Sequence, residues 1–331
     1  MSRLSPEAAR ALMAETLGRC NTAPANAASV AEALVGAELV GQSGHGLRRL
    51  PSYAAQAASG KVDGHAVPRA EPVRPGLLAV DAGHGFAYPA IALAIDALPA
   101  MARAQGIAAA GIRRSHHAGV TGLFAEELAR RGLVALVLVN TPAAIAPWGA
   151  KRGLFGTNPV AFAAPLPGAE PVVIDLSVSR VARGRIMAAA QKGEPIPQGW
   201  ALDAEGRPST DPKAALGGTM LPMGGAKGAA LALMVEVLAA GLTGANYGWQ
   251  ASSFFDADGP PPGTGQFLMA LDPEAMHAGA LERIATLAAA VEGEADARLP
   301  GRRRQALRAR LTAEGIPLDP ELARQIAALG R

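Results

Sequence analysis

The middle of the chain reads Gly153-Leu-Phe-Gly-Thr-Asn-Pro159, then Val160-Ala-Phe-Ala-Ala-Pro165, then Val172-Val-Ile-Asp-Leu-Ser-Val-Ser179. The two apolar runs have the length of strands, and residues typical of turns separate them. We therefore expect two buried strands that end beside polar loops. Rigid strand ends hold small polar groups in fixed geometry, which suits the polar part of a ligand. Each group alone could simply cap a turn or a helix; the set comprises Thr157, Asn158, Asp175, Ser177 and Ser179.

On both sides of this stretch the pattern divides the chain into three segments. Residues 1–72 have helical spacing, with Ser5 as a helix cap and Pro51 tolerable only in a first turn. Residues 73–274 mix strands and helices, and residues 275–331 are helical again and could return to pack on the first segment. The expected helices are 27–40, 47–58, 87–106, 123–131, 182–191 and 229–242, the expected strands are 77–80, 107–112, 133–139 and 266–271, and the expected loops include 113–119 and 193–212.

Composition bounds the class of protein. The 331 residues suffice for one large domain or two, half are apolar, and the net charge of +3 gives no argument for nucleic acid. Cys20 is the single cysteine, which excludes internal disulfides and fits a reducing compartment. The sequence shows neither a signal peptide nor a membrane span, so we expect a cytoplasmic protein.

Glycine-rich segments do not form a standard dinucleotide fingerprint, because no Gly-x-Gly-x-x-Gly follows a strand. Gly224-Gly-Ala-Lys-Gly228 instead places backbone amides and Lys227 at a helix start. That combination can receive an anion such as a cofactor phosphate, or it can be a closely packed helix start. The sequence favours neither of the two.

His45 lies between two glycines just before a helix, where its imidazole is exposed and can transfer a proton near neutral pH. Arg49 follows one helical turn later, and its guanidinium could hold a substrate carboxylate with the next carbon near His45. Its neighbour Arg48 projects about 100° away, so one of the two faces the site. The alternative is a loop histidine beside a surface arginine.

The other histidines and the arginine-rich tail give weaker signals. His116 and His117 are adjacent and point in different directions, so a metal site is not expected, although one of them can line a pocket. His65, His84 and His277 have no supporting context. The run 298–310 is best interpreted as a solvated helix face, with the narrower option that Arg302 or Arg303 contacts a cofactor phosphate.

Eight motifs in order carry a resemblance that each motif alone would not. The chain resembles the malate/L-lactate dehydrogenase family of the sulfolactate dehydrogenase type, a non-Rossmann group that includes ureidoglycolate dehydrogenases and cyclic ketimine reductases. The resemblance runs from about residue 34 to 315. The motifs are Gly44-His-Gly-Leu-Arg-Arg-Leu-Pro-Ser-Tyr53, Ser115-His-His117, Gly156-Thr-Asn-Pro159, Asp175-Leu-Ser177, Ile196-Pro-Gln-Gly-Trp-Ala-Leu-Asp203, Thr210-Asp-Pro212, Gly225-Ala-Lys-Gly228 and Leu299-Pro-Gly301.

The resemblance implies a fold and a set of roles. It implies a mixed, largely antiparallel sheet of α/β (α+β) class with a separate helical region, and a homodimer whose active sites lie near the subunit interface. His45 would donate the proton, with Asp175 able to pair with it, and Arg49 would bind the substrate carboxylate. His117 and Thr157 would line the substrate site. The expected cofactor contacts are His117, Asn158, Asp175, Leu176, Ser177, Lys227, Pro300, Gly301 and Arg302.

Two positions depart from the family pattern. Gly44 stands where the family usually has serine directly before the histidine, which removes an expected Ser-His contact. Arg302 stands where the family often has glutamate, which favours NADPH over NADH as the form of NAD(P)H used.

The leading hypothesis is therefore an NAD(P)-dependent 2-hydroxy acid dehydrogenase of the malate, lactate or sulfolactate type. The alternative is a cyclic ketimine reductase acting on Δ1-piperideine-2-carboxylate or Δ1-pyrroline-2-carboxylate. A more distant alternative is a non-catalytic dinucleotide- or RNA-binding protein. His45 and Arg49 argue against the last, since binding alone needs neither. We expect a small-molecule substrate and no metal, nucleic acid or membrane partner.

Overall fold

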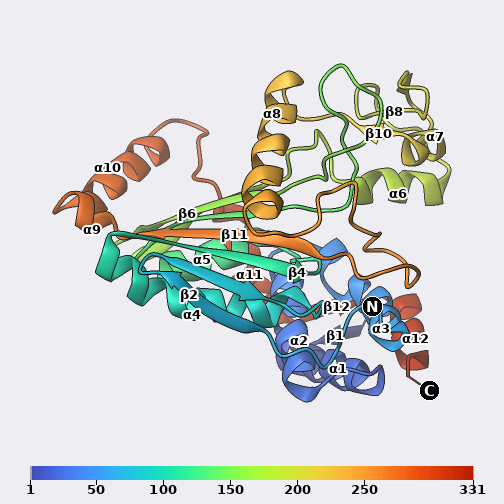
Figure 1. Ribbon diagram of the computed structural model, residues 1–331, viewed down its shortest axis with the longest axis horizontal. Coiled ribbons are helices and arrows are strands. Elements are labelled where there is room, and N and C mark those ends of the chain that lie inside the picture. Colours follow the sequence, from blue (N-terminus) through green and yellow to red (C-terminus); the bar gives the residue numbers. More distant parts are fainter. Residues whose placement is uncertain (1, 331) are drawn as a thin grey trace.

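The computed structural model describes residues 2–330, and its N-terminal part is helical (Figure 1). Ser5 caps the first helix by accepting a hydrogen bond from the amide of Ala8. Pro51 lies in the first turn of the third helix, where its missing amide leaves no bond unmade. The helices are α1 (Pro6–Arg19), α2 (Pro24–Leu39) and α3 (Leu50–Ser59), with the 3-10 turns η1 (Ser43–His45) and η2 (Leu47–Arg49) before α3.

The end of the chain returns to these helices. α11 (Arg302–Glu314) packs on α2, and α12 (Pro320–Ala328) packs on α3. Between them β12 (Ile316–Leu318) pairs antiparallel with β1 (Ser2–Leu4), a ribbon that the sequence does not reveal because its strands lie at opposite ends of the chain. Both ends of the chain contribute to one core, which includes Met13, Leu34, Tyr53, Leu311, Ile316 and Ile326.

A seven-stranded sheet forms the centre, in the order β2-β3-β4-β11-β5-β6-β7. In this sheet, as far as residues 2–330 show it, β3 and β4 run parallel and every other neighbouring pair is antiparallel. The prediction of a mixed, largely antiparallel sheet is confirmed. The strands are β2 (Arg69–Arg74), β3 (Leu77–Asp81), β4 (Ile107–Ser115), β5 (Val134–Val139), β6 (Val160–Leu166), β7 (Ala169–Leu176) and β11 (Thr264–Leu271).

Two helices, α4 (Ala87–Gln105) and α5 (Thr121–Arg130), cover one face of this sheet (Figure 1). Their buried faces are rich in alanine, and the strands opposite them also present small side chains. Small side chains on both sides allow close packing of helix on sheet, so a core with few aromatic residues still fills its space. Ala90, Ala94, Ala125, Ala108, Ala110 and Ala135 are representative.

Between β7 and β11 the chain forms a smaller lobe, whose structure differs from two of the predictions. The expected polar loop 193–212 contains two short strands, and the expected helix 229–242 changes to a π-helix at Glu236. The two short strands pair with each other, and the first of them also pairs with residues 219–220, whereas the π-helix begins at a residue that binds distant segments. The lobe contains α6 (Arg183–Lys192), β8 (Ala201–Leu202), β9 (Pro208–Ser209), α7 (Pro212–Gly217), β10 (Thr219–Met220), α8 (Ala226–Val235) and the π-helix η3 (Glu236–Gly241).

Among the strands that are longer than predicted, two matter for the site. β4 continues to Ser115, into the expected loop, and β7 continues to Leu176. Pairing with β6 extends β7, since Val160 is the partner of Leu176 and Ala161 the partner of Asp175. Asp175 and Leu176 therefore lie within a strand and not in the loop after it.

The segment between the sheet and α11 contains α9 (Pro273–Met276) and α10 (Ala280–Glu292). α10 packs on β6, away from the N-terminal helices, so the return of the chain begins only at α11 (Figure 1). Where the chain divides into domains stays a prediction. Within residues 2–330 no helix combines the length and the apolar character that crossing a membrane requires.

Candidate active site

His45 lies in a tight turn between α2 and α3, half-buried beside the end of the sheet. Glu38 shapes this turn, because its carboxylate accepts a hydrogen bond of 2.8 Å from the amide of Leu47. A Cβ atom at Gly46 would overlap the Glu38 side chain, so a larger residue there would displace the carboxylate that shapes the turn. The turn thus holds the imidazole on a rigid base.

The partner of His45 is another histidine. Nδ1 of His45 lies 3.2 Å from Nε2 of His117, and the two rings are nearly parallel, with centroids 5.1 Å apart. The prediction that Asp175 pairs with His45 is wrong as a direct contact. Asp175 instead accepts hydrogen bonds from the Thr121 hydroxyl at 2.9 Å and from Arg304 at 2.7 Å. Its charge still acts on His45 through space.

Two buried tyrosines extend the chain of hydrogen bonds on the side of His117 that faces away from His45. The hydroxyl of Tyr53 lies 2.6 Å from Nδ1 of His117 and 3.0 Å from the hydroxyl of Tyr88. Burial raises the pKa of Tyr53 to about 12, so it stays a neutral phenol. The sequence motif contains Tyr53, but nothing local in it indicates a contact with His117, which lies on another element.

Arg49, and not Arg48, faces the site. Its side chain is 8% exposed, Nε donates to the carbonyl of Gly44 at 3.1 Å, and one Nη donates to the carbonyl of Phe254 at 3.4 Å. Its guanidinium also lies over the ring of Phe255, 4.4 Å from the centroid. Arg48 points outward to Asp319. These contacts fix the plane of the Arg49 guanidinium near His45.

The electrostatics of this cluster disfavour positive charge on the imidazoles. Burial and the charge of Arg49 lower the pKa of His45 to about 4, while Asp175 acts in the opposite direction. Burial and Arg49 also lower the pKa of His117 well below its usual range. His116, which contacts the side chain of Gln56, has its pKa lowered to about 3 by burial. Both imidazoles of the His45–His117 pair are therefore neutral at pH 7 in the free protein.

Thr157 and Asn158 have different environments. Thr157 is half-buried, with its amide bound to the Thr141 hydroxyl at 3.0 Å, and its own hydroxyl lies 3.4 Å from the same oxygen. Asn158 is completely buried, and its amide group binds Glu236, the carbonyl of Ala232 and the amide of Thr141. Protein groups thus bind the polar side-chain atoms of Asn158, and its contact with a cofactor stays a prediction.

Several of the other expected cofactor residues come together around the end of β7. Leu176 is partly exposed, and the Ser177 hydroxyl lies 2.8 Å from that of Ser179. The amide of Met223 donates to the carbonyl of Val178, which brings the exposed Lys227 at the start of α8 toward the same edge. On the other side, the carbonyl of Pro300 accepts a hydrogen bond from Val173, and Gly301, with a φ of 94°, begins α11.

Arg302 does not face this group of residues. Its Nε donates to Glu292 at 2.8 Å, and it also contacts the carbonyl of Glu170. The prediction that Arg302 contacts a cofactor phosphate is therefore not supported by its position. Arg304, two residues later, is the arginine of α11 that reaches Asp175. The sequence places several arginines in this run without indicating which of them points to the sheet.

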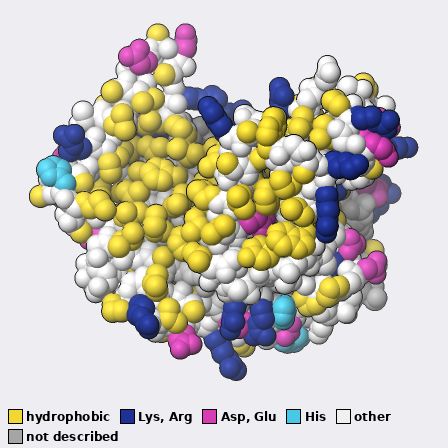
Figure 2. All heavy atoms as spheres, turned by 45° about the horizontal axis from the view of Figure 1, so that its top comes forward, with side chains coloured by type: hydrophobic (Ala, Val, Ile, Leu, Met, Phe, Trp, Pro, Cys, Tyr) yellow, Lys and Arg dark blue, Asp and Glu magenta, His cyan; other side chains and the backbone are white. Residues whose placement is uncertain are grey.

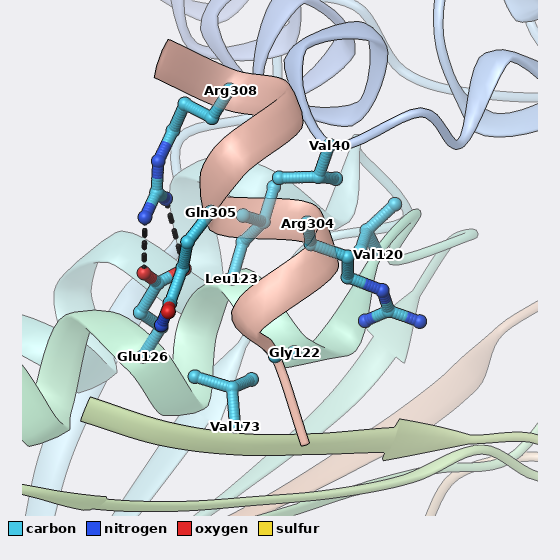
Figure 3. Close-up of a pocket in the computed structure, with 10 residues that line it drawn as sticks. Val40, Val120, Gly122, Leu123, Glu126, Val173, Arg304, Gln305 and Arg308 are labelled. Carbon is cyan, nitrogen blue, oxygen red and sulfur yellow. Dashed lines mark hydrogen bonds and ion pairs between the residues drawn. The ribbon is translucent and has the colours of Figure 1, made fainter. Parts of the chain in front are cut away.

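Figure 3 shows how α11 lies over α5. Arg304 and Arg308 project from α11 on different sides, and Arg308 forms an ion pair with Glu126 at 2.6 Å. The backbone passes so close here that a Cβ atom at Gly122 would overlap the carboxylate of Asp175. The small pocket between the helices is lined by Val40, Val120, Gly122, Leu123, Glu126, Val173, Gly301, Arg304, Gln305 and Arg308.

In the part of the chain that the structure describes, no group of three His, Cys, Asp or Glu side chains is placed to hold a metal ion. The site combines the imidazole of His45 in a tight turn with the guanidinium of Arg49, whose orientation is fixed beside it. The start of α11, which carries Arg304, lies nearby. This set can bind a small carboxylate and transfer a proton to it or from it.

Comparison with known proteins identifies one family and several similar dehydrogenases and reductases. The malate/L-lactate dehydrogenase family matches residues 4–327. A (2R)-3-sulfolactate dehydrogenase (NADP(+)) of Chromohalobacter salexigens is 52% identical over 90% of this chain and 89% of its own. A Δ1-pyrroline-2-carboxylate/Δ1-piperideine-2-carboxylate reductase of Pseudomonas syringae is 44% identical over 89% of this chain and 87% of its own. The crystal structure of Δ1-piperideine-2-carboxylate reductase from Pseudomonas syringae superposes with a TM-score of 0.94, at 40% identity, covering 99% of this chain and 100% of the other.

Proposed function

The chain belongs to the malate/L-lactate dehydrogenase family, a family of oxidoreductases, and we propose that it reduces a small 2-oxo acid to the 2-hydroxy acid with NADPH. Sulfopyruvate, the oxo acid that gives sulfolactate, is the favoured substrate because of the 52% identical relative named for sulfolactate and NADP(+). The observation in the structure that carries the proposal is the buried, oriented guanidinium of Arg49 beside His45.

Arg49 supports the role of carboxylate anchor. Two of its N–H groups bind main-chain carbonyls and fix its plane, and no group within residues 2–330 takes the remaining donors. A carboxylate can accept two parallel hydrogen bonds from a guanidinium, which sets the orientation of the carbonyl carbon next to it. The substrate is then placed with its carbonyl toward His45.

His45 supports the role of proton donor, and substrate binding prepares it for that role. A carboxylate on Arg49 neutralises one of the charges that lower the pKa of His45, so the imidazole binds a proton more readily in the complex. His45 can then give this proton from Nε2 to the carbonyl oxygen as negative charge develops there. His117, at Nδ1, keeps the ring in a fixed orientation.

The residues around β7 and α11 fit a nicotinamide dinucleotide. The first amides of a 13-residue helix, together with Arg304 in its first turn, suit a phosphate, and Gly301 allows close approach. The nucleoside part could contact the carboxylate of Asp175, the apolar side chain of Leu176 and the hydroxyl of Ser177. Lys227 adds a positive charge at the same edge. When bound, the cofactor supplies the hydride to the carbonyl carbon. His117 would contact the nicotinamide end.

A second candidate is the reduction of a cyclic imine with a carboxylate, such as Δ1-piperideine-2-carboxylate. The relative that is 44% identical and the structure with a TM-score of 0.94 favour it. In this reaction Arg49 has the same role, while the ring nitrogen takes the place of the carbonyl oxygen before His45. The two candidates thus differ in the substrate and not in the anchoring group.

The partner we propose is a second copy of the chain. Helix α8 and the π-helix η3 expose large hydrophobic side chains, and Figure 2 shows hydrophobic side chains over a broad area of this face. Monomeric proteins rarely leave such a continuous area open to water. The exposed residues include Leu231, Leu233, Met234, Val237, Leu242, Trp148 and Trp249. The proposed location is the cytoplasm, to which the single, reduced cysteine is suited.

A substrate panel tests the function. We expect NADPH oxidation with sulfopyruvate to have the highest kcat/KM among sulfopyruvate, oxaloacetate, pyruvate and the two cyclic imine carboxylates, and NADH to serve less well. A higher kcat/KM with a cyclic imine would select the second candidate. No turnover of any of the five with either cofactor would contradict the proposed function.

A further inference from the structure

We propose that Tyr53, which is also hydrogen-bonded to Tyr88, sets the direction of a chain of hydrogen bonds that ends at His45, and thereby decides which nitrogen of His45 carries the proton in the resting protein. Tyr53 is on this view a positioning residue, acting through His117. The inference rests on the proposed function in one respect, namely that His45 is the group that transfers the proton.

The chain of contacts joins four separate segments of the protein. Tyr88 on α4 meets Tyr53 on α3 at 3.0 Å, Tyr53 meets Nδ1 of His117 at 2.6 Å, and Nε2 of His117 meets Nδ1 of His45 at 3.2 Å. Tyr53 and Tyr88 are 0% and 4% exposed, and His117 is 6% exposed. Only His45 opens to the site. The chain therefore has one buried end and one end at the reacting groups.

Counting donors gives the chain a direction. A phenol has one proton to donate, and a neutral imidazole has one. Within residues 2–330, Tyr53 is the one group to which the Tyr88 hydroxyl is hydrogen-bonded. If Tyr88 donates to Tyr53, then Tyr53 donates to His117, His117 donates from Nε2 to His45, and every buried proton has an acceptor. In the opposite direction the proton of Tyr88 is buried without one, which is unfavourable.

The favoured direction fixes the tautomer of His45. Nδ1 of His45 then accepts a hydrogen bond, so the proton of the neutral ring lies on Nε2, the nitrogen that remains for the substrate. Forming the imidazolium puts a second proton on Nδ1 and requires the whole chain to reverse. This adds to the effects of the other groups that face His45, which are the charges of Arg49 and Arg304 and, in the opposite sense, Asp175.

The two tyrosines are not equivalent, which provides a matched control. In Tyr53→Phe either position of the proton on His117 leaves one buried group unpaired, so neither direction is favoured. In Tyr88→Phe the hydroxyl of Tyr53 has His117 as its remaining partner and still donates to it. Each variant removes one buried hydroxyl, but only the first removes the bias.

Nuclear magnetic resonance of protein labelled with 15N in its six histidines reads the tautomer directly, and His45→Gln assigns the His45 signals. We expect the Nε2–H form of His45 to exceed the Nδ1–H form by about fivefold or more in the wild-type protein and in Tyr88→Phe. We expect comparable amounts of the two forms in Tyr53→Phe. The same variant should raise the pKa of His45, followed by NMR, by roughly one unit, and Tyr88→Phe should move it less.

An Nδ1–H tautomer in the wild-type protein would overturn the inference, and so would equal effects of the two substitutions. Should Tyr53→Phe not fold, the wild-type protein and Tyr88→Phe still decide the tautomer. The NMR measurement uses no substrate. A protein with the expected tautomer that reduces neither oxo acids nor cyclic imines would contradict the proposed function and leave the direction of the chain established.

Discussion

Nδ1 of His45 lies 3.2 Å from Nε2 of His117, while the carboxylate of Asp175 is bound to Thr121 and Arg304. A neutral imidazole therefore occupies the place where a carboxylate was expected. A carboxylate in contact would stabilise the imidazolium, whereas a neutral partner does little to offset burial and the charge of Arg49. The substrate itself must supply the compensating negative charge.

The pH dependence of reduction follows from this arrangement. His45 must be protonated to donate, and burial with the charge of Arg49 lowers the pKa of His45 to about 4 in the free protein. The value of kcat/KM reports the free protein, so it should fall as the pH rises above about 4. The value of kcat reports the complex, in which the carboxylate offsets Arg49, so its midpoint should lie at a higher pH. If the pH midpoints of kcat/KM and kcat were equal or in the reverse order, the substrate carboxylate would not raise the pKa of His45 as we expect.

The anchoring role predicts that Arg49→Lys is harmful although it keeps the charge. Lysine lacks the planar fork that fixes a carboxylate, and the contacts to Gly44 and Phe254 are lost with it. We expect kcat/KM to fall roughly tenfold or more, with KM and kcat both affected and the Kd of NADPH unchanged. Arg48→Lys is the control, because Arg48 points to Asp319 on the surface. Greater damage from the control would show that Arg48 is the anchor.

Arg304 is the arginine of α11 that we expect to favour NADPH. It lies at Asp175 at the end of β7, whereas Arg302 is engaged with Glu292. Charge-assisted contacts to a phosphate contribute about 1.5–3 kcal/mol, so Arg304→Ala should weaken NADPH binding roughly ten- to hundredfold and NADH binding less. Calorimetry of both cofactors with Arg304→Ala and Arg302→Ala checks this. A selective loss of NADPH binding in Arg302→Ala alone would show that Arg302, the residue suggested by the sequence, is the one that favours NADPH.

The exposed hydrophobic face predicts a dimer that one charge can weaken. Leu233 on α8 is 51% exposed, and a glutamate there would be buried without a partner in the proposed interface. Leu233→Glu should shift the protein from dimer to monomer in sedimentation velocity at micromolar concentration. Val67→Glu, at an exposed position remote from α8 in the sequence, is the control. A wild-type protein that sediments as a monomer would remove this part of the proposal.

Local signals in the sequence were reliable where local chemistry determines structure. Ser5 caps α1, Pro51 begins α3, and Leu77 and Ile107 begin the strands predicted there. The sheet order could not follow from such signals, because β11 joins the sheet between β4 and β5, far from both in the sequence. The resemblance, and not periodicity, predicted its largely antiparallel character.

Contacts between distant segments account for what the sequence missed. The π-helix begins at Glu236, whose buried carboxylate binds Asn158, Asn140 and two backbone amides from other segments. Similarly, the sequence identified His45 and His117 separately but could not pair them. It placed the arginines of α11 in one run, and only the structure shows that Arg304 pairs with Asp175 while Arg302 pairs with Glu292.

The role of His45 as proton donor is tested most directly by a single-turnover measurement of NADPH oxidation by the wild-type protein and by His45→Ala, with the best oxo acid or imine found. General acid groups typically contribute about 10²–10⁴-fold, so His45→Ala should be slower by at least about a hundredfold while its Kd for NADPH is unchanged. An oxidation rate within a few-fold of the wild-type rate would contradict this role and remove His45 from the mechanism.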